Sequence, residues 1–204
     1  MQNKIGRLAT HYAHWHDHVN HVCAPKELQH WLTDRGSLTA KLIAHSEQFR
    51  VQRLFQQSAS CWPDEYAEIG MPKAGKAHAR EVLLLCNDIP VVFAHTVLPL
   101  NATASQWPLF RTLGNKSLGS TLFGDPLVAR GAMQFARLQP NHPAVRRARG
   151  FIDNPSMNNP NQPLYARRSL FYRRGGVMLV TELFLPSIAL CTVSTNSPHQ
   201  TEPR

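Results

Sequence analysis

A single glutamate lies within an unusually apolar segment near the end of the chain. Glu182 belongs to the run VMLVTELFL at residues 177–185, which is apolar on both alternating faces if it forms a strand. An ionised carboxylate among such side chains is costly unless it is paired or protonated. From position 126 onwards there are ten arginines and three acids, the others being Asp153 and Glu202. Glu182 is therefore either a candidate functional carboxylate or a buried acid that one of these arginines satisfies.

An arginine stands at the head of a second apolar run. Arg80 begins the segment REVLLLC at residues 80–86, and in a strand it shares a face with Val82 and Leu84. A guanidinium in that position can hold a carboxylate through two parallel hydrogen bonds. The alternative is an arginine at a strand end that is simply solvated.

Two predicted helix openings offer further contacts to an anion. Leu38 follows Ser37, and Leu118 follows Ser117, and each serine is a favourable residue to precede a helix. The first N–H groups of a helix have no partner within the helix, so they can bind an anion or be satisfied by the capping serine. Together with the arginine and the buried acid, they predict an apolar pocket. At one end the arginine and the helix N–H groups would bind a carboxylate of the ligand, and at the other end the acid would bond a hydroxyl.

The amino terminus is rich in histidine. On a helix, four of its five histidines would share one face, where imidazoles can bind a metal. The alternative, which we favour, is a mobile polar extension without a metal, because only Asp17 is available nearby to complete a ligand set. The five residues are His11, His14, His16, His18 and His21.

Familiar catalytic signatures are absent. The sequence contains no G-x-S-x-G and no G-x-G-x-x-G, and GNKSLG at residues 114–119 lacks the G-K-[ST] ending of a phosphate-binding loop. A serine hydrolase or a nucleotide-binding protein is therefore not supported.

Composition and charge define the broad class. At 204 residues, with 43% hydrophobic and 17% charged residues, the chain has the composition of one globular domain. No apolar run approaches the roughly 20 residues of a membrane span, and the amino terminus lacks the apolar core of a secretory signal, so we expect a cytoplasmic protein.

The net charge of +9 favours anionic partners. The cysteines form no C-x-x-C pair and are expected to be reduced thiols; they are Cys23, Cys61, Cys86 and Cys191.

Periodicity and turn residues predict an antiparallel α+β domain. Helices are expected at residues 25–32, 38–45, 105–113 and 118–123. Strands are expected at residues 49–55, 79–86, 91–98, 127–137, 167–173 and 177–185. Residues 87–90 and 174–176 are predicted to be tight hairpin loops, which favour antiparallel pairing over helical crossovers. The proline- and asparagine-rich residues 140–163 are predicted to form a long irregular loop.

Six segments together carry a family resemblance. They are HWLTDRGSLTAKL at 30–42, REVLLLC at 80–86, VLPL at 97–100, LGNKSLGSTLF at 113–123, YARRSLFYRRGGVMLV at 165–180 and TELFLP at 181–186. Their order and spacing resemble the chorismate pyruvate-lyase family over about residues 25–190. We therefore expect a chorismate lyase-like domain at 25–190, preceded by a polar His-rich extension at 1–24 and followed by a polar tail at 191–204.

The resemblance implies a fold and an activity. The fold would be a single antiparallel β-sheet with helices packed over it as flaps. The activity would be the conversion of chorismate into 4-hydroxybenzoate and pyruvate, the first committed step of ubiquinone biosynthesis, with the aromatic product released slowly. The resemblance implies no metal or organic cofactor. The partner would be the small molecule chorismate, and we expect a monomer that binds no nucleic acid and has no membrane span.

The resemblance also assigns roles to residues. Arg80 would bind the ring carboxylate, together with the backbone N–H groups of Leu38 and Leu118, and Glu182 would meet the ring hydroxyl. Leu38 stands where some family members carry Met, and His78 and Ala79 precede Arg80 where an aromatic-aliphatic pair is more usual. A second arginine is expected near the enolpyruvyl carboxylate, and Arg168 and Arg137 are the candidates.

Other functions stay open at this level. The same fold class serves as the effector-binding half of bacterial winged-helix repressors, so a non-catalytic module that binds a small carboxylate is one alternative. A nucleic-acid binder is another, although the arginines of the carboxyl half lack a basic run or stacking aromatics. A third is a lyase that acts on chorismate but yields another hydroxybenzoate.

Overall fold

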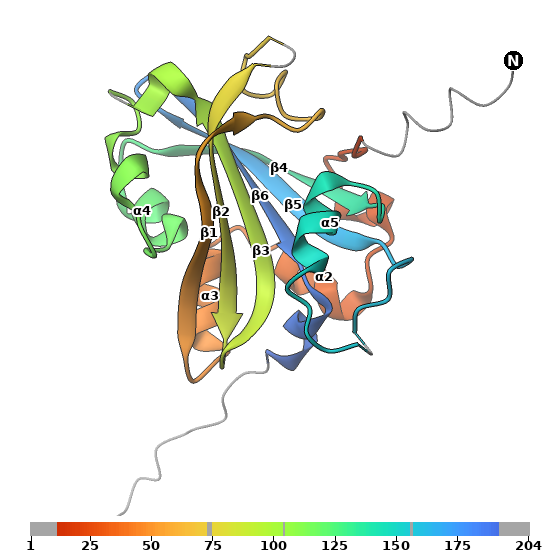
Figure 1. The fold of residues 1–204 in the computed structure, drawn as a ribbon. Helices are drawn as coiled ribbons and strands as arrows, with labels where there is room; N and C mark the ends of the chain where they lie inside the picture. Colours follow the sequence, from red (N-terminus) through yellow and green to blue (C-terminus); the bar gives the residue numbers. More distant parts are fainter. Residues whose placement is uncertain (1–11, 73–74, 104, 156, 192–204) are drawn as a thin grey trace, which may run out of the picture.

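The computed structural model describes residues 12–72, 75–103, 105–155 and 157–191. Its centre is one six-stranded antiparallel sheet with the strand order β1-β2-β3-β6-β5-β4 (Figure 1). The strands are β1 (Phe49–Ser60), β2 (Lys76–Cys86), β3 (Ile89–Pro99), β4 (Ala129–Leu138), β5 (Leu164–Arg173) and β6 (Gly176–Phe184). The predicted α+β fold with a single antiparallel sheet is confirmed.

Short helices cover both faces of this sheet. The α-helices are α2 (Lys26–Leu32), α3 (Leu38–Ala44), α4 (Leu118–Gly124) and α5 (Pro143–Arg149). The 3₁₀ helices are η2 (Val19–Val22), η3 (Leu100–Thr103), η4 (Pro108–Thr112) and η5 (Pro186–Leu190). Helices α2, α3 and α4 cover one face of the sheet and α5 covers the other (Figure 1). Their buried side chains pack on these faces. None of the helices in the described ranges is long and apolar enough to cross a bilayer.

Both hairpins use two-residue turns. Asn87 and Asp88 join β2 to β3 with φ of +50° and +62°, the left-handed conformation that matches the twist of the flanking strands. The loop predicted at residues 87–90 is therefore too long, because β3 already begins at Ile89. Pro90, which has no N–H to donate, is accommodated beside a register shift in the ladder. Arg174 and Gly175 make the second turn, with φ of +49° and +76°.

The region predicted as an irregular loop at residues 140–163 contains α5, so this prediction is wrong in part. Pro143 stands in the first turn of the helix, where its missing N–H has no cost. The side chain of His142 caps the helix by accepting from the N–H of Ala144. The proline therefore begins a helix instead of breaking one.

The predicted extension at residues 1–24 also needs correction where the structure describes it. His16 forms a two-way backbone bridge with Phe135 of β4, with N···O distances of 2.9 and 2.8 Å. Val19 and Val22 are buried in the same apolar cluster as α2 and α3. Residues 12–24 therefore pack on the domain, because their apolar side chains find partners there. Residues 1–11 and 192–204, parts of the predicted extension and tail, lie outside the described residues.

Among the described histidines, His14, His16, His18 and His21 do not share a helical face, and His11 lies outside the described residues. Residues 13–15 have no regular structure, and η2 is a single 3₁₀ turn. The rings of His16 and His21 are 5.4 Å apart. No group of three or more His, Cys, Asp or Glu residues within the described ranges is arranged to hold a metal ion.

Candidate active site

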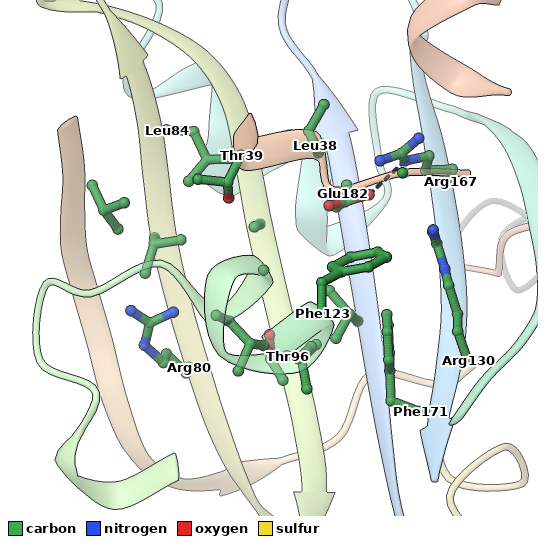
Figure 2. A pocket seen from close by; sticks show the side chains of 18 residues that line it. Leu38, Thr39, Arg80, Leu84, Thr96, Phe123, Arg130, Arg167, Phe171 and Glu182 are labelled. Carbon is green, nitrogen blue, oxygen red and sulfur yellow. Dashed lines mark hydrogen bonds and ion pairs between the residues drawn. The ribbon is translucent and has the colours of Figure 1, made fainter. Parts of the chain in front are cut away.

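A pocket lies between the sheet and helices α3 and α4. It has an empty volume of about 600 Å³, part of it open to solvent, and all six strands of the sheet contribute residues to its floor, from β1 at one edge to β4 at the other. The four predicted site residues, Leu38, Arg80, Leu118 and Glu182, all line this one pocket. Figure 2 labels Leu38, Arg80 and Glu182 in it. Strand alternation explains the placement, since Arg80 shares its face with Val82 and Leu84, and Glu182 shares its face with Val180.

Arg80 is almost completely buried, with 2% of its surface exposed. Its Nη2 donates to the backbone carbonyl oxygens of Gly114 and Lys116 at 3.1 and 2.9 Å. Its Nε has no hydrogen-bond partner, and no carboxylate among the described residues lies within ion-pair distance. Burial, helped by the charge of Arg53, lowers the pKa of Arg80 to about 10. The buried guanidinium therefore keeps an Nε–H donor without a hydrogen-bond partner and a charge that no described carboxylate neutralises.

Glu182 is paired with an arginine that the sequence did not single out. The Nε of Arg167 lies 2.5 Å from Oε2 of Glu182. The Nη1 of the same guanidinium donates to the carbonyl oxygens of Trp31, Leu32 and Asp34 at 2.9, 3.4 and 2.7 Å. The two interpretations of Glu182 therefore both apply: it lines the pocket and an arginine satisfies it. Arg167 also fixes the segment that leads into α3.

Neither candidate for the second arginine lines the pocket. Arg168 points to the opposite face, where it bonds Gln134 and Glu68, and Arg137 is exposed. The arginines that do line the pocket besides Arg80 are Arg130 of β4 and Arg167 of β5. Alternation along β5 sends neighbouring arginines to opposite faces, so composition alone could not choose between them.

The first turns of α3 and α4 meet over the pocket. Ser37 caps α3 by accepting from the N–H of Ala40. Ser117 makes no such cap; its Oγ lies 2.5 Å from Oγ1 of Thr39 and thereby joins the two helices. Gly119 makes this approach possible, because a Cβ there would lie 2.9 Å from Oγ1 of Thr39.

A buried polar network lies behind Arg80 on the other face of the sheet. His95 stands between Glu65 and Glu81, with N···O distances of 3.2 and 3.3 Å, and its ring stacks on Trp62. Arg147 pairs with the second oxygen of Glu81 at 2.6 Å. Burial alone would lower the pKa of His95, but the two glutamates, Glu65 foremost, raise it to about 9. The two carboxylates therefore favour the protonated form of the buried His95 imidazole.

Comparison with known proteins identifies the family. The family model described as chorismate lyase matches residues 9–192. The chain belongs to the chorismate lyase family. One relative, a probable chorismate pyruvate-lyase of Cupriavidus pinatubonensis, is 48% identical over 164 residues, which cover 80% of this chain and 83% of the relative. Another, from Nitrosomonas europaea and similarly named, is 41% identical over 171 residues, covering 84% and 93%.

Solved structures that resemble this chorismate lyase family member share its fold at low identity. The carboxy-terminal domain of PhnF superposes with a TM-score of 0.52 and 14% identity, covering 72% of this chain and 89% of that one. A GntR-family transcriptional regulator from Bacillus cereus gives 0.50 and 12%, covering 69% and 94%. At these identities the likeness concerns the fold alone.

Proposed function

We propose that this protein is a lyase that converts chorismate into 4-hydroxybenzoate and pyruvate. One observation carries the proposal: Arg80, with its unpaired Nε, and Glu182 line the same apolar pocket. On the sheet, β3 lies between them, and Arg80 pairs with Thr96 while Glu182 pairs with Ala94. Their backbones are therefore roughly 12 Å apart, given strand spacings of about 4.8 Å and a rise of about 3.4 Å per residue. Two side chains that reach inward across this separation leave room for one substituted six-membered ring.

The reaction needs orientation more than chemical activation. When the C3–O ether bond of chorismate breaks and the C4–H bond is lost, the electron pair of the C–H bond completes an aromatic ring. The departing enolpyruvyl group takes up a proton at its methylene carbon and becomes pyruvate. Aromatisation drives the reaction, so the protein has to hold the ring, stabilise the charge on the leaving oxygen and exclude water.

The described residues divide these tasks. Arg80 holds the ring carboxylate, and the N–H groups of Leu38 and Leu118 at the starts of α3 and α4 complete the grip. Glu182, held in place by Arg167, meets the C4 hydroxyl. Glu182 then acts as a base at C4, or it fixes the hydroxyl while the leaving group takes the C4 proton. Chorismate deuterated at C4 separates these roles, because only the second carries deuterium into the methyl group of pyruvate.

The enclosure of the pocket supports slow release of the aromatic product. The Thr39–Ser117 contact joins the two helices over the ring-binding space, so a ring that leaves between these helices must first break this contact. On this proposal the product feeds ubiquinone biosynthesis, and the protein is a cytoplasmic monomer that requires no cofactor and binds no nucleic acid.

A non-catalytic carboxylate-binding module is not favoured. The sequence relatives, at 38% to 48% identity, are named as probable lyases, whereas the solved structures that share the fold at a TM-score of 0.50 or more are only 12% to 15% identical. Catalysis is the property that distinguishes the two.

The experiment that tests the proposal is a product assay. Purified protein is mixed with chorismate in the presence of EDTA, and the aromatic and keto-acid products are separated and quantified. We expect 4-hydroxybenzoate and pyruvate in equal amounts without added metal. Binding without turnover would support the non-catalytic module, and a different hydroxybenzoate would support the alternative lyase.

A further inference from the structure

The pocket carries more positive charge than its one carboxylate balances. Three arginines line it, Arg80, Arg130 and Arg167, against a single acid, Glu182. Arg167 is paired with Glu182. No carboxylate among the described residues lies within ion-pair distance of Arg80 or Arg130. Two guanidinium groups therefore remain for a ligand, and an apolar pocket with two spare positive charges suits a dianion.

Hydrogen bonds hold Arg130 in a fixed orientation, but no carboxylate among the described residues pairs with its charge. Its Nε donates to Oγ of Ser169 and its Nη1 to the carbonyl oxygen of Arg35, both at 3.1 Å. Its guanidinium lies 5.5 and 5.9 Å from the ring centres of Phe171 and Phe123. A guanidinium has five N–H donors, and these bonds use only two. The remaining donors, those of Nη2 included, have no partner among the described residues.

Arg130 lies at the Glu182 end of the pocket. Its side chain extends beside Phe171 towards Arg167 and Glu182 (Figure 2). Burial lowers the pKa of Arg130, and the charge of Glu182 is the largest influence that opposes the shift. Arg80, by contrast, lies two strands beyond β6, on β2. The two unpaired arginines therefore stand at different ends of the space between sheet and helices.

This arrangement matches the positions of the two carboxylates of chorismate. The ring carboxylate is on C1, and the hydroxyl on C4 is opposite to it. The enolpyruvyl ether is on C3, next to the hydroxyl carbon, so its carboxylate lies near whatever holds the hydroxyl. With the ring carboxylate at Arg80 and the hydroxyl at Glu182, the enolpyruvyl carboxylate falls on the side of Arg130.

Arg130 also borders a second, outer hollow. Residues that line this hollow include Asp17, His18, Thr33 and Arg35, and Arg130 lines both it and the pocket. The guanidinium thus stands where the pocket meets the outer surface. A small acid detached from the ring at this point has a short path to solvent, whereas the ring itself stays beneath α3 and α4.

We propose that Arg130 binds the enolpyruvyl carboxylate and makes the site selective for the dianionic substrate over the monoanionic aromatic product. The inference rests on the proposed function, because it assigns the second carboxylate of that substrate. Cleavage removes the group that Arg130 holds, so 4-hydroxybenzoate keeps its contacts with Arg80 and Glu182 and loses the contact with Arg130.

The test compares substrate and product in one variant. Arg130→Met removes the charge while retaining an unbranched side chain beside the two phenylalanines. We expect the KM for chorismate to rise at least about 10-fold, the loss of a charge-assisted hydrogen bond. We expect the inhibition constant of 4-hydroxybenzoate to change less than about threefold, since the product makes no such bond. Arg130→Lys, which keeps the charge, should recover part of the substrate affinity, and Arg137→Met, an exposed arginine on the same strand, should change neither constant.

A binding experiment separates failure of this inference from failure of the proposed function. The probe is 3-(1-carboxyethoxy)-4-hydroxybenzoate, an unreactive dianion, compared with 4-hydroxybenzoate by calorimetry. If the wild-type protein prefers the dianion and Arg130→Met abolishes that preference, the inference holds even for a protein that does not turn chorismate over. If chorismate is turned over but Arg130→Met weakens both ligands equally, or neither, the inference is overturned and the lyase function stands. A wild-type protein that binds neither probe refutes both.

Discussion

Arg167 and Glu182 occupy directly paired positions on β5 and β6, and their side chains form an ion pair with an Nε–Oε2 distance of 2.5 Å. The same guanidinium binds the carbonyl oxygens of Trp31, Leu32 and Asp34. One buried side chain thus fixes both the carboxylate of the pocket and the segment that leads into the covering helix α3. The position of Glu182 is therefore set by the packing of two layers.

Replacing Glu182 by glutamine should separate charge from shape. Glu182→Gln keeps the volume and can still accept a hydrogen bond from Arg167, so we expect a loss of stability of about 1–2 kcal/mol. Turnover of chorismate should fall at least about 100-fold, the scale of one acid-base or electrostatic contributor.

Arg167→Met should instead cost about 3–5 kcal/mol of stability, because it leaves a partly buried carboxylate unpaired. Urea unfolding and steady-state kinetics on both variants measure these effects, and wild-type turnover by Glu182→Gln would refute its assigned role.

Arg80 should be needed for binding the ring carboxylate. We expect Arg80→Ala to lower turnover at least about 100-fold and to weaken 4-hydroxybenzoate as well as chorismate, since both carry that carboxylate. Arg50→Ala is the matched control, because Arg50 is an exposed arginine that pairs with Asp88 at the surface. Kinetics and product inhibition on the two variants give the comparison. If Arg80→Ala left the affinity for the product unchanged, the orientation of the ring would be wrong.

The close approach of α3 and α4 should control how long the product stays. In Gly119→Ala the new Cβ would lie 2.9 Å from Oγ1 of Thr39, which displaces the hydroxyl from its bond with Ser117. We expect the dissociation rate of 4-hydroxybenzoate to rise about fivefold, the equivalent of one hydrogen bond of about 1 kcal/mol. Gly124→Ala on the same helix meets no atom within 4 Å and should leave the rate unchanged. Stopped-flow displacement of the product measures both, and equal rates in the two variants would show that this contact does not limit release.

The buried His95 should make stability depend on pH in the alkaline range. Its pKa rises from 6.5 to about 9 on folding, so the folded state binds the proton more tightly than the unfolded state. The resulting stabilisation, on the order of 3 kcal/mol, is complete below pH 6.5 and is lost as the pH rises towards about 9. Urea unfolding between pH 6 and 10 tests this expectation. In His95→Gln the loss over this window should disappear; if the variant keeps it, another group is responsible.

The strand pattern predicts the sheet and two of the four charged residues that line the pocket, Arg80 and Glu182. Each of the two apolar runs carries one charged residue on this face, and strand alternation places Arg80 on the same face as Val82 and Leu84, and Glu182 on the same face as Val180. The structure puts all of these residues in one pocket. Leu38 and Leu118 were found from the serines that precede them. These features depend on local pattern, which a single sequence contains.

Whether Arg167 or Arg168 lies opposite Glu182 depends on a single residue in the length of the hairpin turn that joins β5 to β6. The turn at Arg174 and Gly175 has two residues, which pairs Arg167 with Glu182. A three-residue loop at 174–176, as predicted, would instead have placed Arg168 opposite Glu182. The positive φ that arginine adopts at 174 is uncommon for that residue type, so the sequence favoured the longer loop. The helix α5 does not follow from the sequence, because the prolines around it are typical of irregular structure, whereas Pro143 occupies the first helical turn, where proline is tolerated.

A crystal structure with bound 4-hydroxybenzoate would show directly how the aromatic ring lies between Arg80 and Glu182. We expect its carboxylate against Nε of Arg80 and the N–H groups at the starts of α3 and α4, with the phenolic oxygen within hydrogen-bond distance of Glu182 and no ligand atom bonded to Arg130. A ring in the reverse orientation, or one bound outside this pocket, would contradict it.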